Sequence, residues 1–301
     1  MRTSLTTALL ALAPLFSLFH TAAATRSPKR GLIFINPREY PEDSAIWDRF
    51  EFVPMMWGLD GDPGNPVFYD KVKAMIEDSV NITHVLSFNE PDGTMSTGGS
   101  DISPKDAARA WVANFEPLSR DLGVKVGLPG CTGAPSGLAW LTSFLKECSA
   151  LVSEGQDKKR NCTYDFLPIH WYGNFEGLAS HVGERLALFP DTPIWVTEYA
   201  LAHEELEPSQ EFFNQTIDWF DKEEFIERYA YFGAFRSTNS NVGPNPVFLN
   251  RDGDLTDIGS WYLGGNATGV NPQSGDNGAG MMRASMSLVL GAGIWATMFL
   301  L

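Results

Sequence analysis

Two glutamates stand at points in the sequence where apolar runs end. Glu90 lies in the segment SFNEPD at 87–92, and Glu198 lies in WVTEYA at 195–200. A carboxylate at the end of a buried strand is costly unless it is paired or takes part in chemistry. Two such carboxyl groups ~5–5.5 Å apart could act as nucleophile and acid/base in the double-displacement hydrolysis of a glycosidic bond. The alternative for either glutamate alone is a salt bridge or a helix cap.

Other residues near the predicted strand ends could bind a sugar. Asn89 could hydrogen-bond a 2-hydroxyl group, a contact that strengthens in the transition state, or it could be a simple turn residue. His170 could orient a carboxylate, and the phenols of Tyr172 and Tyr199 could donate to the nucleophile. Aromatic rings could stack on sugars, although Trp and Tyr are also ordinary core residues. The candidate substrate-binding residues are Asn89, Trp57, His170, Trp171, Tyr172, Tyr199 and Trp261.

Other kinds of site are poorly supported. The sequence contains no H-E-x-x-H or C-x-x-C metal motif, no G-x-S-x-G nucleophile motif, and no G-x-G-x-x-G after the first predicted strand. We therefore predict neither a metal nor a cofactor. The chain has 22 basic and 37 acidic residues, and its formal net charge of −15 argues against nucleic acid as a partner.

Strand-like and helical segments alternate between residues 31 and 265. The apolar runs are 31–36, 52–57, 84–88, 125–129, 166–170, 194–198, 229–235 and 246–249, and the helical segments are 69–79, 104–122, 138–148, 178–189 and 209–225. Such alternation implies parallel strands joined by crossover helices. About eight strands over roughly 235 residues predict one α/β domain, a (β/α)8 TIM-type barrel. A doubly wound open sheet is the alternative.

The predicted barrel brings the two glutamates together. In (β/α)8 barrels the C-terminal strand ends and the loops after them form the active site. Glu90 follows the third predicted strand and Glu198 ends the sixth. We therefore expect their side chains to face each other across the barrel mouth.

Three cysteines are too few for a scaffold built on disulfides. Cys148 and Cys162 bracket a polar loop, and a disulfide between them would close about 14 residues and contribute ~3 kcal/mol in the chain-entropy model. Cys131 is left over, and we interpret it as a small buried residue. The sequence around Cys131 offers neither the histidine nor the cationic setting that a nucleophilic thiol needs.

Both ends of the chain look like targeting signals. Residues 1–24 have the basic start, apolar run and A-x-A-type site of a signal peptide, which implies an oxidising compartment. Lys29-Arg30 is a weak dibasic trimming signal. Residues 266–277 form a polar linker, and 278–301 form the apolar tail of a removed GPI-anchor signal, with Asn277 as the candidate attachment site. A membrane-spanning helix is the alternative for this tail.

These signals predict a secreted protein at the cell surface or cell wall that contacts the membrane only through the anchor. Four Asn-x-Ser/Thr sequons are candidate N-glycosylation sites and therefore predicted surface positions: Asn81, Asn161, Asn214 and Asn266. Any single sequon is weak evidence.

The motifs together resemble glycoside hydrolase family 128, whose members occur in fungi, plants and bacteria. The resemblance rests on SFNEPD at 87–92, LPG at 128–130, DFLPIHWYG at 165–173 and WVTEYA at 195–200, and it extends over roughly 31–264. It implies a (β/α)8 barrel that acts on β-1,3-glucan with retention of configuration. It also implies that Glu90 is the acid/base and Glu198 the nucleophile.

Several functional alternatives remain open. The same chemistry becomes transglycosylation if an acceptor sugar replaces water. The same barrel could also be a non-catalytic β-glucan-binding or structural protein of the cell wall, because a fold does not determine a function. A weaker alternative is hydrolysis of another β-linked glycan such as β-1,4-mannan. The expected partner is β-1,3-glucan or its oligosaccharides, and we expect a monomer.

Overall fold

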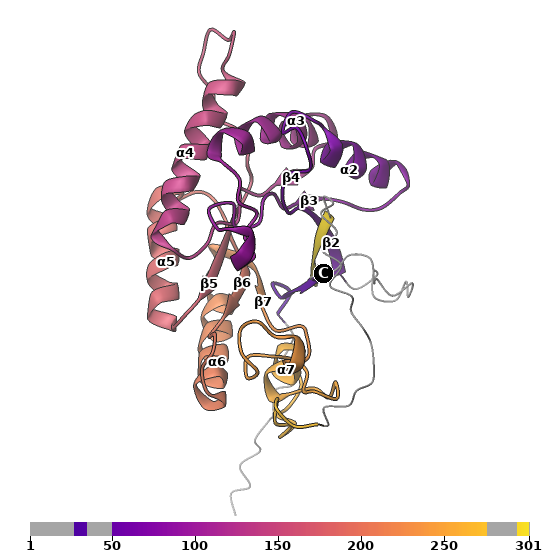
Figure 1. The fold of residues 1–301 in the computed structure, drawn as a ribbon, viewed down its shortest axis with the longest axis vertical. Helices are drawn as coiled ribbons and strands as arrows, with labels where there is room; N and C mark the ends of the chain where they lie inside the picture. Colours follow the sequence, from indigo (N-terminus) through magenta and orange to yellow (C-terminus); the bar gives the residue numbers. More distant parts are fainter. Residues whose placement is uncertain (1–26, 35–49, 276–293, 301) are drawn as a thin grey trace, which may run out of the picture.

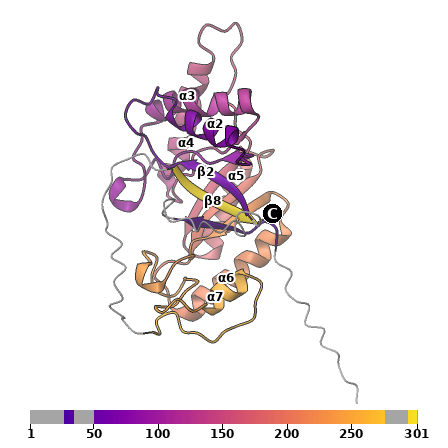
Figure 2. The same cartoon turned by 90° about the vertical axis from the view of Figure 1, so that its right-hand side faces the viewer.

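The computed structural model describes residues 27–34, 50–275 and 294–300 (Figure 1). The strands in these ranges are β1 (Gly31–Phe34), β2 (Phe50–Met56), β3 (His84–Val85), β4 (Lys125–Val126), β5 (Leu167–Tyr172), β6 (Ile194–Ala200), β7 (Ile226–Tyr231) and β8 (Ile294–Leu300). The helices are α2 (Val67–Glu77), α3 (Pro104–Leu122), α4 (Pro135–Val152), α5 (Phe175–Leu188), α6 (Leu206–Lys222) and α7 (Asp257–Tyr262). Strands run through the middle of the molecule, with α2 and α3 on one side and α6 and α7 on the other (Figures 1 and 2).

Strands β2 to β7 are parallel neighbours in chain order. One sheet contains β5, β6 and β7, and another contains β3 and β4. Single parallel bridges join Met55 to Leu86 and Gly127 to Phe166, which link β2 to the β3 segment and the β4 segment to β5. This is the (β/α)-type arrangement that the alternating sequence predicts. The regular ladders are short and belong to three separate sheets, so the closed eight-stranded barrel stays a prediction.

The predicted eighth strand at 246–249 is wrong. Leu249 makes only isolated bridges, to Arg236 and Leu255, and no ladder forms. Pro246 has no N–H to donate to a neighbouring strand. Phe248 is instead buried in the core, where its ring stacks on Tyr231 at 5.8 Å. The apolar run reflects this core position and not a strand.

Strand β8 comes from the C-terminal tail. It lies between β1 and β2 and pairs antiparallel with both, with Leu32 opposite Met298 and Val53 opposite Thr297. No strand was predicted in this tail, and the parallel strands were expected within 31–265. The sequence analysis assigned the same tail to a removed anchor signal, and that removal stays a prediction.

Helix α3 shows how the sequence determines the helical layer. The Ser103 hydroxyl accepts a hydrogen bond from the Asp106 N–H at 3.1 Å and caps the N-terminus, and Pro104 fills the first helical position. Gly123 ends the helix in the left-handed conformation, with φ of 67°. The prediction of a helix at 104–122 is confirmed. The other four predicted helices also form, within a few residues of the expected bounds, whereas α7 was not predicted.

The core lies between the strands and the helices and is rich in aromatic rings. Trp111 of α3 stacks on Phe115 with ring centroids 4.6 Å apart and meets Phe144 of α4 edge-on at 5.3 Å. Beside β6 and β7, Tyr231 packs on Phe213 of α6 at 5.2 Å. All five side chains are fully buried. Large buried aromatic rings of this kind dominate core energetics.

Lys29 and Arg30 bind the start of β1 to the C-terminal ends of α6 and α7. The Lys29 ammonium donates to the Glu223 carbonyl at 2.8 Å, beyond the C-terminus of α6. The Arg30 guanidinium is buried and donates to the Tyr229 hydroxyl at 3.0 Å and to the Tyr262 carbonyl at 2.8 Å, at the end of α7. Cationic groups are favourable at helix C-termini. The structure thus gives this pair an anchoring role, which the expected dibasic trimming would abolish.

A buried charge network lies at the N-terminal strand ends. Glu51 of β2 contacts the His84 ring at 2.5 Å and also bonds Thr83 and Arg228. Burial opposes ionisation of Glu51, but the hydrogen bonds from His84 and Thr83 and the charge of Arg228 outweigh it and lower the pKa of Glu51 to about 2. Arg228 also lies over the Trp195 ring at 4.5 Å. The network therefore requires an ionised Glu51.

The predicted disulfide between Cys148 and Cys162 is confirmed, and Cys131 is a buried free thiol. All four sequon asparagines are exposed, as predicted for candidate glycosylation sites: Asn81, Asn161, Asn214 and Asn266. The predicted signal peptide at 1–24 and the candidate attachment site Asn277 lie outside the described residues. Within the described ranges, no helix has the length and apolar character needed to span a membrane.

Candidate active site

Glu90 is held at the end of the β3 segment by an unusual backbone conformation. The chain beyond β3 bridges to the β4 segment at Asn89 and Gly130, and the Glu90 N–H donates to the Gly130 carbonyl at 2.7 Å. Glu90 has φ of 40°, a region that residues other than glycine rarely occupy. The turn directs its side chain toward β5 and leaves the carboxyl group 13% exposed.

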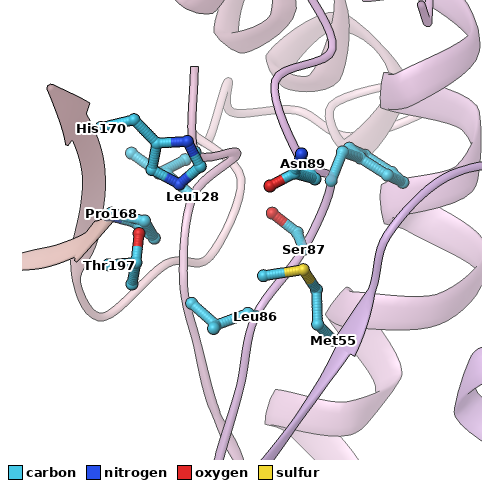
Figure 3. Close-up of a pocket in the computed structure, with 10 residues that line it drawn as sticks. Met55, Leu86, Ser87, Asn89, Leu128, Pro168, His170 and Thr197 are labelled. Atoms are coloured by element: carbon cyan, nitrogen blue, oxygen red, sulfur yellow. The ribbon is translucent and has the colours of Figure 1, made fainter. Parts of the chain in front are cut away.

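Glu198 reaches the same place because the pairing of β6 is irregular. Ile169 of β5 pairs with Val196, but His170 pairs with Glu198, so the register skips Thr197. A bulge of this kind redirects side chains, and bulges are common beside active sites. Thr197 lines a narrow pocket together with His170 (Figure 3), and Glu198 lies next to it, with 14% of its side chain exposed.

One imidazole nitrogen joins the two carboxyl groups. His170 Nδ1 lies 3.0 Å from Glu90 Oε1 and 3.5 Å from Glu198 Oε2. Tyr172 is two residues further along β5, so its side chain leaves the same face of the strand. The Tyr172 hydroxyl donates to Glu198 Oε2 at 2.6 Å. One carboxylate oxygen of Glu90, one of Glu198 and one ring nitrogen of His170 all lie within 4.8 Å of one another.

A glycine provides the space for this imidazole. A Cβ atom at Gly130 would lie 3.0 Å from His170 Nε2, which is closer than the imidazole could accept without moving. Gly130 also accepts the Glu90 N–H through its carbonyl. Figure 3 shows His170 and Asn89 on opposite sides of the pocket, above Ser87. The LPG segment at 128–130 therefore contributes to the site through its backbone, because Gly130 has no side chain that would displace His170.

The charges of Glu90, His170 and Glu198 influence one another. Burial raises the pKa of Glu198, and the nearby Glu90 raises it further against the opposing effects of His170 and Tyr172. Burial alone would lower the pKa of His170, but the charges of Glu198 and Glu90 outweigh burial and raise it. Such groups titrate as a unit. The charge state of Glu198 therefore depends on the charges of its two neighbours, Glu90 and His170.

The Tyr172 hydroxyl stays a donor. The Tyr172 residue is 37% exposed, but loss of solvent around its hydroxyl and the adjacent Glu198 carboxylate raise the pKa of Tyr172 well above its usual value. A neutral phenol beside an ionised carboxylate stabilises the charge through a charge-assisted hydrogen bond. The hydrogen bond therefore favours the ionised form of Glu198 and opposes part of the rise in its pKa.

This geometry agrees with the comparisons with known proteins. A family model described as "Glycosyl hydrolase catalytic core" matches residues 36–262. The chain belongs to this family. The chain is also 28% identical over 190 residues to alkali-sensitive linkage protein 1 of Schizosaccharomyces pombe, covering 60% of this chain and 32% of that protein. The chain thus spans about a third of the length of this curated relative.

Solved structures also resemble this glycosyl hydrolase core. A family 128 (subgroup II) endo-β-1,3-glucanase from Pseudomonas viridiflava is 25% identical, with a TM-score of 0.55, over 72% of this chain and 80% of the other. A subgroup VII oligosaccharide-binding protein from Cryptococcus neoformans is 22% identical, with a TM-score of 0.52, over 70% and 78% of the two chains. The predicted membership of glycoside hydrolase family 128 is confirmed.

In this glycosyl hydrolase core, Tyr199 does not line the site. Its side chain is fully buried on the other side of β6 from Glu198. The Tyr199 ring packs on Phe220 at 5.0 Å and on Tyr231 at 5.1 Å. The prediction that Tyr199 contacts the nucleophile or a sugar is wrong, because adjacent residues on a strand point to opposite faces.

Two predicted tryptophans also lie apart from the carboxyl groups. Trp171 leaves the face of β5 opposite to His170, and its indole N–H donates to the Asn174 carbonyl at 2.9 Å, at the start of α5. Trp261 belongs to α7, where its ring packs on Phe213 at 6.2 Å. The end of α7 contacts Arg30 near the N-terminal strand ends, away from Glu90 and Glu198.

Trp57 and Asn89 do lie near Glu90. The Trp57 carbonyl accepts the Asn89 N–H at 2.9 Å, which joins the end of β2 to the segment that carries Glu90. The Asn89 side-chain amide donates to the Gly98 carbonyl at 3.0 Å and so helps to fold that loop. A sugar-binding role for either residue stays a prediction.

The sequence analysis missed Asp92, which follows Glu90 by two residues and binds the loop after β4. The one signal for it in the sequence is that the SFNEPD motif contains a second acidic residue besides Glu90.

The site also has side chains of the kinds that bind metal ions, since imidazole and carboxylate groups bind ions such as zinc. The three residues that could hold such an ion are Glu90, His170 and Glu198.

Proposed function

We propose that this chain is a retaining glycoside hydrolase that cleaves β-1,3-glucan by double displacement. One observation carries the proposal: the carboxyl groups of Glu90 and Glu198 both approach His170 Nδ1, at 3.0 and 3.5 Å. Retaining enzymes need carboxyl groups ~5–5.5 Å apart, whereas inverting enzymes need ~6.5–9.5 Å to admit a water. Oxygen atoms within 4.8 Å of one another fit the retaining spacing.

In the first step, ionised Glu198 attacks the anomeric carbon of a glucosyl unit while protonated Glu90 donates its proton to the leaving oxygen. The glycosidic bond breaks and a covalent glycosyl–enzyme forms. In the second step, Glu90 takes a proton from water, which attacks the anomeric carbon and releases Glu198. The two inversions restore the starting configuration. Tyr172 stabilises the Glu198 carboxylate before attack and after release.

The family supports the choice of substrate. The Pseudomonas viridiflava relative is described as an endo-β-1,3-glucanase of family 128. We extend that substrate class to this chain because the arrangement of its two carboxyl groups, His170 and Tyr172 supports double displacement. We also propose that the protein is secreted, glycosylated and held at the cell wall through a GPI anchor, which would place it beside such a glucan.

A second candidate is binding without catalysis. The Cryptococcus neoformans neighbour is described as an oligosaccharide-binding protein, so the same fold also occurs in binding proteins. Transglycosylation is a third outcome of the same chemistry, in which a second sugar replaces water in the second step. Product analysis separates all three.

The test is to incubate the secreted protein with laminari-oligosaccharides of defined length and to separate the products. We expect shorter sugars from the wild type and at least a ~1,000-fold slower reaction for Glu198→Gln, because a neutral amide cannot form the intermediate. Glu204→Gln, in the exposed loop after β6, is the matched control and should retain wild-type activity. Products longer than the substrate would indicate transglycosylation. Binding without any product from the wild type would contradict the hydrolase.

A further inference from the structure

Asp92 links two loops at the mouth of the site. Its Oδ1 accepts the Thr132 N–H at 2.9 Å, and its Oδ2 accepts the hydroxyls of Thr132 at 2.5 Å and of Ser136 at 3.1 Å. Asp92 belongs to the loop that carries Glu90, Thr132 follows the β4 segment, and Ser136 lies in the first turn of α4. One half-buried carboxylate therefore ties the acid/base loop to the next loop and its helix.

Helix α4 depends on this carboxylate at its N-terminus. The N-cap residue is Ala134, which has no side-chain oxygen and makes no capping hydrogen bond. The Asp92 Oδ2 atom is close enough that a Cβ at Gly137 would lie 3.4 Å from it. An anionic group at a helix N-terminus is stabilised by the helix dipole and by the free N–H groups there. The loop after β3 thus supplies the anion that α4 lacks.

Glu90 needs support from its surroundings. With φ of 40° it occupies a sparsely populated conformation, which persists only where neighbouring groups hold it. Its N–H is fixed by the Gly130 carbonyl at 2.7 Å, and its carbonyl accepts the Gly93 N–H at 2.8 Å. Asp92 lies between these two backbone contacts and makes the side-chain link from this turn to α4.

We propose that Asp92 is a positioning residue for the acid/base Glu90: its bonds to Thr132 and Ser136 keep the strained turn, and therefore the Glu90 carboxyl group, in the geometry that protonates the leaving oxygen. Asp92 acts through Glu90 and not on the sugar. This inference rests on the proposed function. It predicts a loss confined to steps that need proton transfer.

The test compares two substrates in Asp92→Asn, which keeps the size of the side chain but removes its charge and one acceptor oxygen. A laminari-oligosaccharide has a poor leaving group and needs protonation by Glu90. A 2,4-dinitrophenyl β-laminaribioside has a good leaving group and does not. We expect kcat/KM for the oligosaccharide to fall ~100-fold, a loss that small misplacement of a catalytic group can cause. For the aryl glycoside kcat/KM should stay near the wild-type value.

Two further variants complete the test. Thr132→Val removes the hydroxyl that donates to Asp92. It should give a smaller loss of kcat/KM that is again confined to the oligosaccharide. This variant decides the question if Asp92→Asn does not fold. Asp106→Asn is the control, because Asp106 lies in the first turn of α3, bonded to Ser103, with no link to Glu90. It should behave as the wild type on both substrates.

Equal losses on both substrates in Asp92→Asn and Thr132→Val would overturn the proposal, since general damage to the fold does not distinguish leaving groups. An unchanged kcat/KM for the oligosaccharide in both variants would overturn it as well. In either case an active wild type would leave the proposed function standing. A wild type that cleaves neither substrate would contradict the proposed function and the role of Asp92 together.

Discussion

At the scale of single residues, His170 organises the site. It lies on β5 between the loop that carries Glu90 and strand β6, which carries Glu198, and its Nδ1 is within 3.5 Å of both carboxyl groups. The sequence placed Glu90 and Glu198 at strand ends and therefore predicted that they meet. It could not predict which neighbours share their face, because the register shift at Thr197 depends on pairing with β5. Tyr172 consequently contacts Glu198, whereas Tyr199 is buried in the core.

We predict that the Tyr172 hydroxyl favours ionisation of Glu198, the proposed nucleophile. Its hydrogen bond to Glu198 favours the carboxylate and lowers the pKa of Glu198 against the effect of burial. Tyr172→Phe removes that effect, so the pKa of Glu198 rises and the acidic limb of kcat/KM moves to higher pH. We expect a ~10-fold or larger loss of kcat/KM, since hydrogen bonds to charged groups contribute about 1.5–3 kcal/mol.

A pH–rate profile measures this effect. Tyr164→Phe is the control, because Tyr164 precedes β5 at the opposite strand end and packs on Phe189. An acidic limb in Tyr172→Phe that stays at the wild-type position would show that the phenol does not act on the nucleophile.

Gly130 tests the role of backbone shape. A methyl group there would lie 3.0 Å from His170 Nε2, so Gly130→Ala should displace the imidazole and lower kcat ~10-fold or more. The fold should persist, because the substitution adds one carbon at the mouth. Gly183→Ala in α5 is the matched control, since its Cβ would meet no atom within 4 Å. Equal kcat values for the two variants would refute the steric argument.

At the scale of elements, the sequence predicted what local rules determine. Helix α3 has its cap, its first-position proline and its terminal glycine in the sequence, and its bounds were predicted correctly. The eighth strand failed because an apolar run of four residues fits a core segment as well as a strand. The position of β8 between β1 and β2 depends on long-range pairing that no local pattern records.

The anchoring of β1 by Arg30 is such a long-range feature. Arg30→Ala removes buried hydrogen bonds to Tyr229 and Tyr262 and the ion pair with Asp221 at 3.5 Å. Loss of one partner from a buried charged contact costs about 3 kcal/mol. We expect the free energy of unfolding in urea to fall by that amount, and exposed Lys158→Ala to change it little. Equal stability of the two variants would contradict the anchoring role.

At the scale of the whole molecule, charge is divided between the two ends of the strands. The cluster of Glu90, His170 and Glu198 lies at the C-terminal ends, and the Glu51 network lies at the N-terminal ends. In barrel-type folds, residues at the C-terminal strand ends commonly serve function, and residues at the N-terminal strand ends commonly serve stability. The sequence could not predict the second cluster, because Glu51, His84 and Arg228 are far apart along the chain.

This division predicts how stability depends on pH. The pKa of Glu51 falls from 4.5 to about 2 on folding. A carboxyl group whose pKa is lowered by folding stabilises the protein at pH values above its pKa in the unfolded chain. This stabilisation is lost as the pH falls toward the pKa in the folded protein. We expect about 3 kcal/mol to be lost between roughly pH 5 and pH 2. Urea unfolding across that range should show a flatter pH dependence for Glu51→Gln, whereas exposed Glu147→Gln should follow the wild type. A Glu51→Gln curve parallel to the wild-type curve would contradict this assignment.

The covalent intermediate tests the central claim most directly. A 2-deoxy-2-fluoro laminaribiosyl fluoride reacts through the first step but slows the second, so it traps the glycosyl–enzyme of a double-displacement enzyme. Mass spectrometry of the digested protein locates the trapped sugar. We predict one added glycosyl group on the peptide that contains Glu198, and none in Glu198→Gln. A label on another residue, or an active enzyme that forms no adduct, would contradict double displacement through Glu198.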